Sequence, residues 1–328
     1  MPRTGGASGV FERVIFIRMD KDLMIVIPVY NEEGPLARNL AEIDRVLAED
    51  GIVPRYMLVD DGSSDGTWDV ISKLAERNGR IGSVRFSRNF GKEAAICAGL
   101  DHADAELCLV MDSDLQHPPR CVAEMLELME RENADIVEGI KTERGSESAG
   151  YRFFANSFYK LLRAVSGLDL MNSSDFKLMT RRVVESMRGF NEGKVFFRGL
   201  VEWSGYKKAQ YPFGVDDRLN GTSRFSKLRL VKMAVDSMLS YTSKPLYITA
   251  VIGLIFLLFA LVMSVQTLYN YFAGHAVSGI STVILIQLIT GAAVMISLGI
   301  IGIYISRIYS ESKRRPRYIV SDSKNIKE

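Results

Sequence analysis

Cysteine and histidine are scarce in this chain of 328 residues, which contains three of each. Cys97, Cys108 and Cys121 form neither a CxxC pair nor a cluster with histidine, so the sequence predicts neither a zinc site nor a disulfide framework. The histidines are too scattered to indicate a catalytic triad. Reduced thiols of this kind are typical of a domain that faces the cytosol.

Several signature loops are also missing. No GxGxxG follows the first apolar segment, which disfavours a nicotinamide-binding domain, and no GxxxxGK[ST] phosphate-binding loop is present. The net charge is only +2, and no basic stripe with interleaved aromatic residues occurs, so nothing indicates nucleic-acid binding.

Two long runs near the C-terminus carry no charged residue, from Leu246 to Phe272 and from Ile280 to Ser306. Each exceeds the roughly 20 apolar residues that cross a bilayer as a helix. A buried core helix is the alternative, but two successive runs favour a membrane hairpin. Lysine and arginine flank the pair and are absent from its loop, which predicts that both termini lie in the cytoplasm.

The part before these runs alternates short apolar segments with amphipathic ones. Apolar segments begin near residues 23, 55, 81, 105 and 135, and helical patterns of 10–15 residues separate them. This alternation predicts an α/β fold with a parallel sheet. The acidic turns 30–32, 60–62 and 112–114 each follow an apolar segment, so we expect them to meet at the carboxyl edge of the sheet, where ligands bind.

Six motifs then occur in the order seen in a known family. They are "IPVYNEE", "VDDGSSDGT", "SRNFGKEAA", "MDSDLQHPP", "SSDFKLMTRR" and "RLNGTSRFS". Over about residues 23–320 the chain resembles family 2 glycosyltransferases with a GT-A fold, a Rossmann-like domain that binds nucleotide sugars. More narrowly, it resembles the polyprenyl-phosphate glycosyltransferases, which include dolichol-phosphate mannosyltransferases and bactoprenol glucosyltransferases. The paired C-terminal membrane helices resemble the bactoprenol branch.

The resemblance assigns the donor side of the site. It implies that Pro28, Tyr30 and Glu32 line the nucleotide pocket. It also implies that Asp60 binds the base and that Lys92 lies near the ribose or the phosphates. Other residues in the same motifs, including Asp61, are interpreted as turn and cap residues.

The resemblance also assigns a metal and the leaving group. It implies that Asp112, Asp114 and Gln116 hold Mg²⁺ or Mn²⁺ together with the diphosphate. Arg218 and Arg224 match positions that grip the leaving diphosphate or the acceptor phosphate. Arginine is a good bidentate partner for phosphate, although lysine is common in the family at the position of Arg224.

The acceptor side is assigned to four further residues. Lys141 and Arg152 fall where basic residues meet the lipid phosphate, although Lys141 replaces a common arginine. Arg198 either faces the phosphate or only extends its charge from a buried helix to solvent. Asp175 matches the acidic residue that orients or deprotonates the acceptor; as an alternative, it caps a helix that begins at "FKLMTRRVV".

These patterns divide the chain into five parts. Residues 1–22 are expected to be a disordered extension, 23–224 the GT-A domain and 225–244 an amphipathic helix lying at the membrane surface. Residues 245–307 form the two-helix membrane hairpin, and 308–328 form a cytoplasmic tail. Small residues at Gly291, Gly299 and Gly302 allow close helix packing and suggest a homo-oligomer such as a tetramer.

The predicted function is inverting transfer of a hexose from a nucleotide sugar to a polyprenyl phosphate at the cytoplasmic leaflet. The resulting β-linked lipid serves later glycosylation of cell-surface polymers. Glucose from UDP-glucose and undecaprenyl phosphate are the first choice. Mannose from GDP-mannose, galactose, N-acetylhexosamine and amino-arabinose stay open as alternatives. A membrane scaffold with a degenerate nucleotide-binding domain is disfavoured because all three acidic loops are intact.

Overall fold

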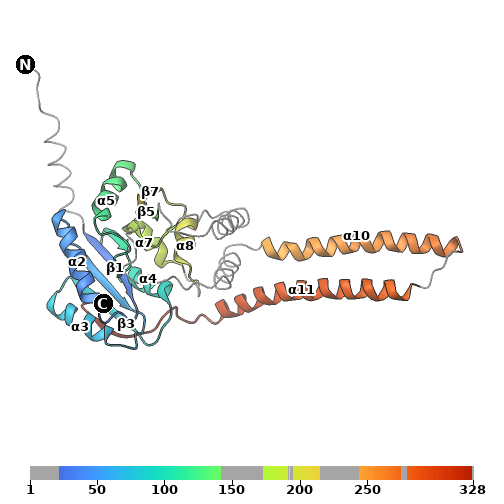
Figure 1. Ribbon diagram of the computed structural model, residues 1–328, viewed down its shortest axis with the longest axis horizontal. Helices are drawn as coiled ribbons and strands as arrows, with labels where there is room; N and C mark the ends of the chain where they lie inside the picture. Colours follow the sequence, from blue (N-terminus) through green and yellow to red (C-terminus); the bar gives the residue numbers. More distant parts are fainter. Residues whose placement is uncertain are drawn as a thin grey trace, which may run out of the picture. The chain divides into compact units, whose positions relative to one another are not determined.

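The computed structural model describes residues 22–141, 173–190, 192, 195–214, 244–274 and 279–326. The chain divides into an α/β unit, which includes the C-terminal segment from Pro316, and a helical unit that ends at Arg315. Figure 1 shows the elements of each unit. Residues 1–21 of the expected extension (1–22) and residues 225–243 of the predicted amphipathic helix lie outside the described residues, so both stay predictions.

Within the described residues, four parallel strands form the centre of an eight-stranded sheet. In the order β4-β1-β2-β3, they are β4 (Leu107–Val110), β1 (Leu23–Val29), β2 (Arg55–Asp60) and β3 (Ile81–Phe86). Every residue of β1 and β4 is buried. Continuous apolar runs are typical of parallel strands that are covered on both faces. The predicted parallel α/β arrangement is therefore confirmed for this part of the sheet.

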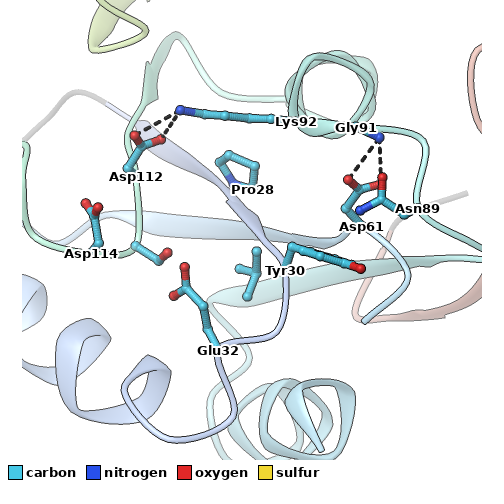
Figure 2. A pocket seen from close by; sticks show the side chains of 11 residues that line it. Pro28, Tyr30, Glu32, Asp61, Asn89, Gly91, Lys92, Asp112 and Asp114 are labelled. Carbon is cyan, nitrogen blue, oxygen red and sulfur yellow. Dashed lines mark hydrogen bonds and ion pairs between the residues drawn. The ribbon is translucent and has the colours of Figure 1, made fainter. Parts of the chain in front are cut away.

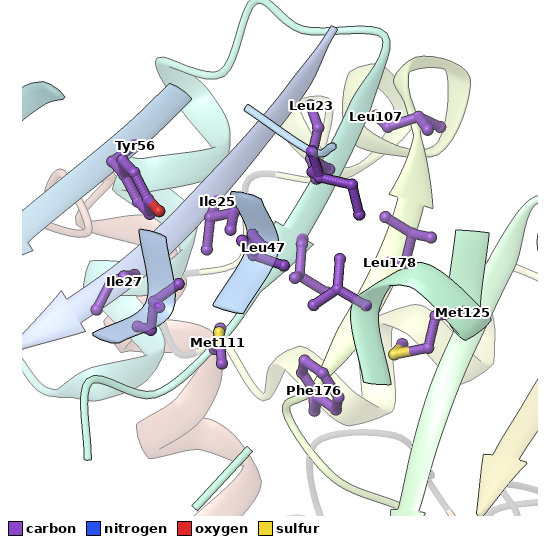
Figure 3. Packing of buried hydrophobic residues seen from close by; sticks show 14 of the residues in the cluster. Leu23, Ile25, Ile27, Leu47, Tyr56, Leu107, Met111, Met125, Phe176 and Leu178 are labelled. Carbon is purple, nitrogen blue, oxygen red and sulfur yellow. The ribbon is translucent and has the colours of Figure 1, made fainter. Parts of the chain in front are cut away.

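Helices connect these strands and cover them. They are α2 (Leu36–Glu49), α3 (Thr67–Arg77), α4 (Lys92–Asp101) and α5 (Cys121–Glu132). Figure 3 shows the core on one side of the sheet, where Ile25 and Ile27 of β1 pack near Leu47 of α2. Alternate residues of a strand point to the same face, so these isoleucines share one layer.

The helix α4 is apolar on almost every side, and its residues 95–100 are all buried. It packs on β1, where Gly99 lies so close to the side chain of Val26 that a Cβ would not fit. A helix buried in this way is held rigidly by its surroundings. Its first residues, Lys92 and Glu93, are therefore fixed relative to the sheet.

The sheet continues beyond β4 with strands of mixed direction. β6 (Lys177–Thr180) pairs antiparallel with both β4 and β5 (Ile136–Lys141), and β5 pairs parallel with β7 (Lys208–Phe213). Two helices belong to this region, α7 (Arg181–Arg188) and α8 (Phe197–Trp203). The interpretation of Asp175 as a helix cap is wrong, because a strand follows it and the next helix begins only at Arg181.

The opposite edge is closed by a strand that the sequence did not predict. β8 (Val320–Lys324) pairs antiparallel with β3, within the segment expected to be a tail. Just before it, the ring of Tyr318 stacks on Phe86 of β3 with a centroid distance of 4.9 Å. The indole N–H of Trp68 donates to Asp322 at 3.2 Å. The C-terminal segment is thus part of the α/β unit.

The helical unit contains α10 (Lys244–Phe272) and α11 (Ile280–Ser312), which lie side by side (Figure 1). Val251–Phe272 and Ile286–Ser312 are long and apolar enough to cross a membrane, judged by length and composition. Most of the side chains described in these segments are exposed. Such a surface suits a hydrocarbon environment better than water. α11 extends five residues beyond the predicted end of the hairpin at 307.

Candidate active site

A cavity of about 310 Å³ lies at the carboxyl ends of β1, β2 and β4 (Figure 2). Its walls come from the loops after these strands and from the loop before α4. The lining residues are Pro28, Val29, Tyr30, Glu32, Asp61, Asn89, Gly91, Lys92, Asp112, Ser113 and Asp114. The expectation that the three acidic turns meet at one edge of the sheet is confirmed.

The loop after β1 is tied to the loop after β2. Asn31 has a φ of 53°, a left-handed conformation that a non-glycine residue adopts at some cost. Its backbone N–H donates to the Ser63 hydroxyl at 2.9 Å, and its side-chain oxygen accepts from the Ser64 N–H at 2.9 Å. The N–H of Glu32 donates to the Thr67 hydroxyl at 2.8 Å. These bonds fix the direction of the Tyr30 and Glu32 side chains.

The two aspartates that end β2 have different surroundings. Asp60 is fully buried, and it accepts from the backbone N–H of Ser63 at 3.0 Å and its hydroxyl at 2.5 Å. Asp61 lines the cavity and accepts from the N–H groups of Phe90 and Gly91 at 2.7 and 2.9 Å. The structure therefore places Asp61, rather than Asp60, in the cavity wall. Neighbouring side chains point in opposite directions at the end of a strand.

The loop after β4 presents Asp112 and Asp114 to the cavity. The backbone N–H of Asp112 donates to Nδ1 of the buried His117 at 3.1 Å, which places the proton of a neutral imidazole on Nε2. Leu115 has a φ of 60°, and the N–H of Gln116 donates to Asp114 at 3.0 Å. Unfavourable backbone conformations of this kind persist only where the surrounding structure enforces them.

Negative charge accumulates on one side of the cavity, where Glu32, Asp112 and Asp114 lie (Figure 2). Burial raises the pKa of Glu32 above its usual range, and the nearby charges of Asp114 and Asp112 raise it further. In the part of the chain described here, Oε2 of Glu32 is buried without a hydrogen-bond partner. A cation next to these groups would relieve both effects.

The same region does not enclose a metal ion by itself. Across the described ranges, no three histidine, cysteine, aspartate or glutamate side chains converge closely enough to hold one. Mg²⁺ uses one or two carboxylates and takes its other ligands from water and substrate phosphates. The two aspartates of the loop after β4 fit such a site, with oxygen ligands of the type that Mg²⁺ and Mn²⁺ prefer.

Lys92 connects this cavity to Asp175. Its Nζ lies 2.7 Å from Oδ1 of Asp112 and 2.9 Å from Oδ2 of Asp175. The guanidinium of Arg198 binds the same Asp175 carboxylate through Nε at 2.7 Å and Nη2 at 3.2 Å. It also donates to the backbone oxygen of Ser173 at 3.1 Å. Asp175 thus lies between two cations, beside the cavity.

The ionisation of Asp175 follows from these partners. Burial by itself favours the neutral carboxyl, but the hydrogen bonds and charges of Arg198 and Lys92 outweigh it and hold the pKa of Asp175 well below its usual range. Burial likewise works against the charge of Lys92, yet Asp175 and Asp112 raise its pKa. A carboxylate held so firmly in its ionised form is a weak proton acceptor at neutral pH.

A buried ion pair lies next to this cluster in the sheet. Lys177 of β6 is 1% exposed and Glu138 of β5 is 3% exposed, and their side chains are paired. The hydroxyl of Ser173 donates to Glu138 at 2.5 Å. Ser173 therefore contacts both charged pairs, because its backbone oxygen accepts from Arg198. The loop that carries Asp175 is anchored on either side of that residue.

The structure places the predicted site residues differently. Six of them line the cavity: Pro28, Tyr30, Glu32, Lys92, Asp112 and Asp114. Asp175 and Arg198 adjoin it through Lys92, whereas Asp60 and Gln116 are not among the lining residues. Lys141 ends β5. The roles assigned to Arg152, Arg218 and Arg224 stay predictions, because these residues lie outside the described ranges.

Other residues of the site were not predicted. Asp61, Asn89 and Gly91 line the cavity. His117 supports the loop of Asp112, and Glu93 lies beside Lys92. The signal that could have revealed Glu93 is its position as a carboxylate at the start of an otherwise apolar helix. Nothing local could have distinguished Asp61 from its neighbour.

Comparison with known proteins adds four findings. Residues 24–188 match the model of Glycosyl transferase family 2. The chain is 34% identical to the uncharacterized glycosyltransferase YkcC of Bacillus subtilis, over 92% of this chain and 94% of that one. It is 32% identical to the bactoprenol glucosyl transferase of Shigella phage SfV, over 92% of this chain and 99% of that one. The glucosyl-3-phosphoglycerate synthase structure from Mycobacterium tuberculosis is 21% identical with a TM-score of 0.46, over 73% of this chain and 83% of that one.

Proposed function

Because the chain belongs to glycosyl transferase family 2, a glycosyltransferase family with the GT-A fold, we propose that it moves a hexose from a nucleotide sugar to a polyprenyl phosphate. Glucose from UDP-glucose and undecaprenyl phosphate are the first choice. The observation that carries the proposal is the bridge from Asp112 through Lys92 to Asp175. It joins a cavity suited to a nucleotide diphosphate with a second carboxylate suited to an acceptor.

The donor would bind in the cavity at the carboxyl ends of the strands. Pro28 and Tyr30 offer apolar surface for a base. Asp61 and Asn89 offer polar groups in the part of the cavity away from Asp112 and Asp114 (Figure 2). The diphosphate would lie toward Asp112 and Asp114, which would hold Mg²⁺ or Mn²⁺ with Gln116 close by. The bound ion would supply positive charge opposite the negative charge that develops on the leaving diphosphate.

The acceptor phosphate needs little chemical activation. A phosphate monoester has a second pKa of about 6 and is mostly ionised at pH 7. Attack on the anomeric carbon by such an oxygen is a single displacement, which inverts that carbon and gives a β-linked product from an α-linked donor. Asp175 is held ionised by Arg198 and Lys92 and would orient the reacting groups rather than take a proton.

Lipid phosphate binding would involve further cations. Lys141 ends β5, and Arg198 contacts Asp175, so both could approach an acceptor at this edge of the sheet. Arg152, Arg218 and Arg224 are assigned to the acceptor phosphate or the diphosphate through the family resemblance. We place the reaction at the cytoplasmic leaflet of a bacterial inner membrane. Support comes from the two apolar helices and from the positive residues that flank them.

A donor screen tests this function directly. The purified full-length chain in detergent is mixed with undecaprenyl phosphate, Mg²⁺ and one radiolabelled donor: UDP-glucose, UDP-galactose, UDP-N-acetylglucosamine or GDP-mannose. We expect label in the lipid fraction with one donor, and a β linkage in the product by NMR. Glu42→Ala, on the exposed face of α2, serves as a control of unchanged activity. Folded protein that transfers no sugar from any of these donors, or an α-linked product, would contradict the proposal.

A further inference from the structure

Two pairs of neighbouring residues meet around Asp175. The first is Lys92 and Glu93, at the start of α4, and the second is Phe197 and Arg198, at the start of α8. Each pair supplies one cation to the Asp175 carboxylate, at 2.9 Å from Lys92 and 2.7 Å from Arg198. The pairs are also bonded to each other, because Oε2 of Glu93 accepts the backbone N–H of Phe197 at 2.7 Å.

This bond is unusual for an acidic residue in the first turn of a helix. Such a residue normally stabilises its own helix through the positive end of the helix dipole, while its carboxylate faces solvent. The carboxylate of Glu93 instead reaches the N–H of a residue 104 positions along the chain. That N–H belongs to the first turn of α8, where backbone donors have no partner within the helix. Glu93 thereby ties α8 to α4.

The consequence for Asp175 follows from the stiffness of the two helices. α4 is buried along most of its length and packs so closely on β1 that a Cβ at Gly99 would not fit. Its position relative to the sheet is therefore fixed. α8 is a short helix of seven residues. Short helices depend on outside contacts for their position. The hydrogen bond from the Phe197 N–H to Glu93 fixes the backbone next to Arg198. It therefore determines the position from which the Arg198 side chain reaches Asp175.

We propose that Glu93 is a positioning residue for the transfer reaction: it holds the start of α8 on α4, so that Arg198 grips both oxygens of Asp175. The proposal rests on the proposed function, and it adds a residue that makes no contact with the donor cavity. The essential property of Glu93 is the reach of its side-chain oxygen to the Phe197 N–H. Its negative charge is not needed for this task.

Three substitutions at Glu93 show whether the length of its side chain or its negative charge matters for kcat. Glu93→Gln keeps the length and the acceptor oxygen, and we expect a kcat within about threefold of the original. Glu93→Asp keeps the charge but is one methylene shorter, and Glu93→Ala removes both. For these two we expect kcat to fall roughly 10- to 100-fold, because small errors in positioning are costly to reaction rates. The KM for the nucleotide sugar should stay within about twofold in all three.

A control and a double variant sharpen the test. Asp101→Ala removes a second carboxylate from α4, one that accepts the Tyr318 hydroxyl at 2.9 Å, and it should leave kcat unchanged. If Glu93 acts through Arg198, the variant carrying both Glu93→Ala and Arg198→Ala should be about as impaired as Arg198→Ala alone. Additive losses in kcat would contradict that route.

Hydrogen–deuterium exchange gives a readout that does not depend on catalysis. In the full-length chain, Glu93→Ala and Glu93→Asp should speed exchange in peptides covering residues 195–203, and Glu93→Gln should not. The proposal would be overturned if Glu93→Asp kept its activity and its slow exchange in residues 195–203 while Glu93→Gln lost activity. The charge of Glu93, and not its reach, would then be the essential property. Failure of the original chain to transfer any sugar would count against the proposed function alone, since the exchange pattern still tests the bond to α8.

Discussion

The two sides of the site use their carboxylates differently. On the donor side, Glu32, Asp112 and Asp114 line the cavity, and Lys92 is the one basic residue among the described residues that line it. On the other side, Asp175 has two cationic partners and Glu138 is paired with Lys177. The first arrangement has excess negative charge that a ligand cation would balance. The second is already neutralised within the chain and forms a rigid framework.

Lys92 belongs to both arrangements. Its ammonium lies within 3 Å of Asp112 and of Asp175, so it is shared between the carboxylate of the donor cavity and the carboxylate of the framework. A donor and its metal ion would compete for Asp112 and leave Lys92 to Asp175 or to a phosphate. The difference between the two sides therefore indicates which carboxylates bind substrates and which maintain geometry.

The largest effect is expected from the donor side. Asp114→Ala removes a proposed ligand of the metal ion from an exposed loop position and should lower transfer roughly 10³-fold, with little change in thermal stability. The assay is initial-rate transfer of labelled sugar to lipid, with a melting curve on the same sample. EDTA should have the same effect on the unaltered chain, and added Mg²⁺ or Mn²⁺ should reverse it. Full turnover in EDTA would show that the donor-side carboxylates do not act through a metal.

On the framework side, a substitution should lower the stability of the fold more than the activity. Lys177→Met leaves the buried carboxylate of Glu138 without its cation, and we expect a loss of about 3–5 kcal/mol in the free energy of unfolding. Adding Glu138→Gln should restore most of that stability, since no unpaired charge then remains. Denaturant unfolding in detergent measures both variants. A stable Lys177→Met variant that loses only activity would place the pair among the substrate-binding groups.

The sequence predicted the donor side better than the framework. Strands β1 and β4 appear as continuous apolar runs. An acidic turn that follows such a strand lies at the carboxyl edge of the sheet, where ligands bind. β6, β7 and β8 are short or polar, and they pair with partners far away in the sequence. Their hydrogen bonds depend on tertiary packing, which overrides local propensity.

Individual residues show the same limit. Asp60 and Asp61 are adjacent and chemically identical, but they point in opposite directions. Asp60 bonds to Ser63, whereas Asp61 lines the cavity and bonds to the loop before α4. Glu93 resembles an ordinary first-turn acid until α8 is placed beside it. The pairing of Lys177 with Glu138 joins neighbouring strands whose register the sequence does not reveal. The sequence gives the type of each side chain, but it does not show which side chains bond to one another in the fold.

A smaller effect is expected at Asp175, which separates orientation from base catalysis. Asp175→Asn keeps the shape and one acceptor oxygen, so an orienting role predicts a loss of roughly 10- to 100-fold with clear residual activity. The pH dependence of that activity should follow the second ionisation of the lipid phosphate, at a pKa of about 6. Transfer is measured between pH 5 and 9. A variant that is inactive at every pH would mean that Asp175 accepts the proton.

The smallest effect concerns Glu93 and pH. Burial of its carboxyl, with the charge of Asp175 nearby, raises the pKa of Glu93 from 4.5 to about 7, although Arg198, Lys92 and the Phe197 N–H oppose the shift. A carboxyl whose pKa is higher in the folded chain stabilises the fold below the unfolded pKa, and that contribution is lost as pH rises through the folded pKa. The original chain should therefore lose stability between about pH 4.5 and pH 7 through this group.

Glu93→Gln removes the titrating proton but keeps the acceptor for the Phe197 N–H. It should match the original chain near pH 5 and exceed it by roughly 1–2 kcal/mol at pH 8, an amount reduced by the partial exposure of the side chain. Glu93→Asp still titrates and should keep the original slope of stability against pH, which makes it the matched control. Melting temperatures at pH 5, 6, 7 and 8 decide the matter. Parallel curves for the original chain and Glu93→Gln would mean that this carboxylate is paired as completely as Asp175, and the neutralised framework would then extend through α4 to the start of α8.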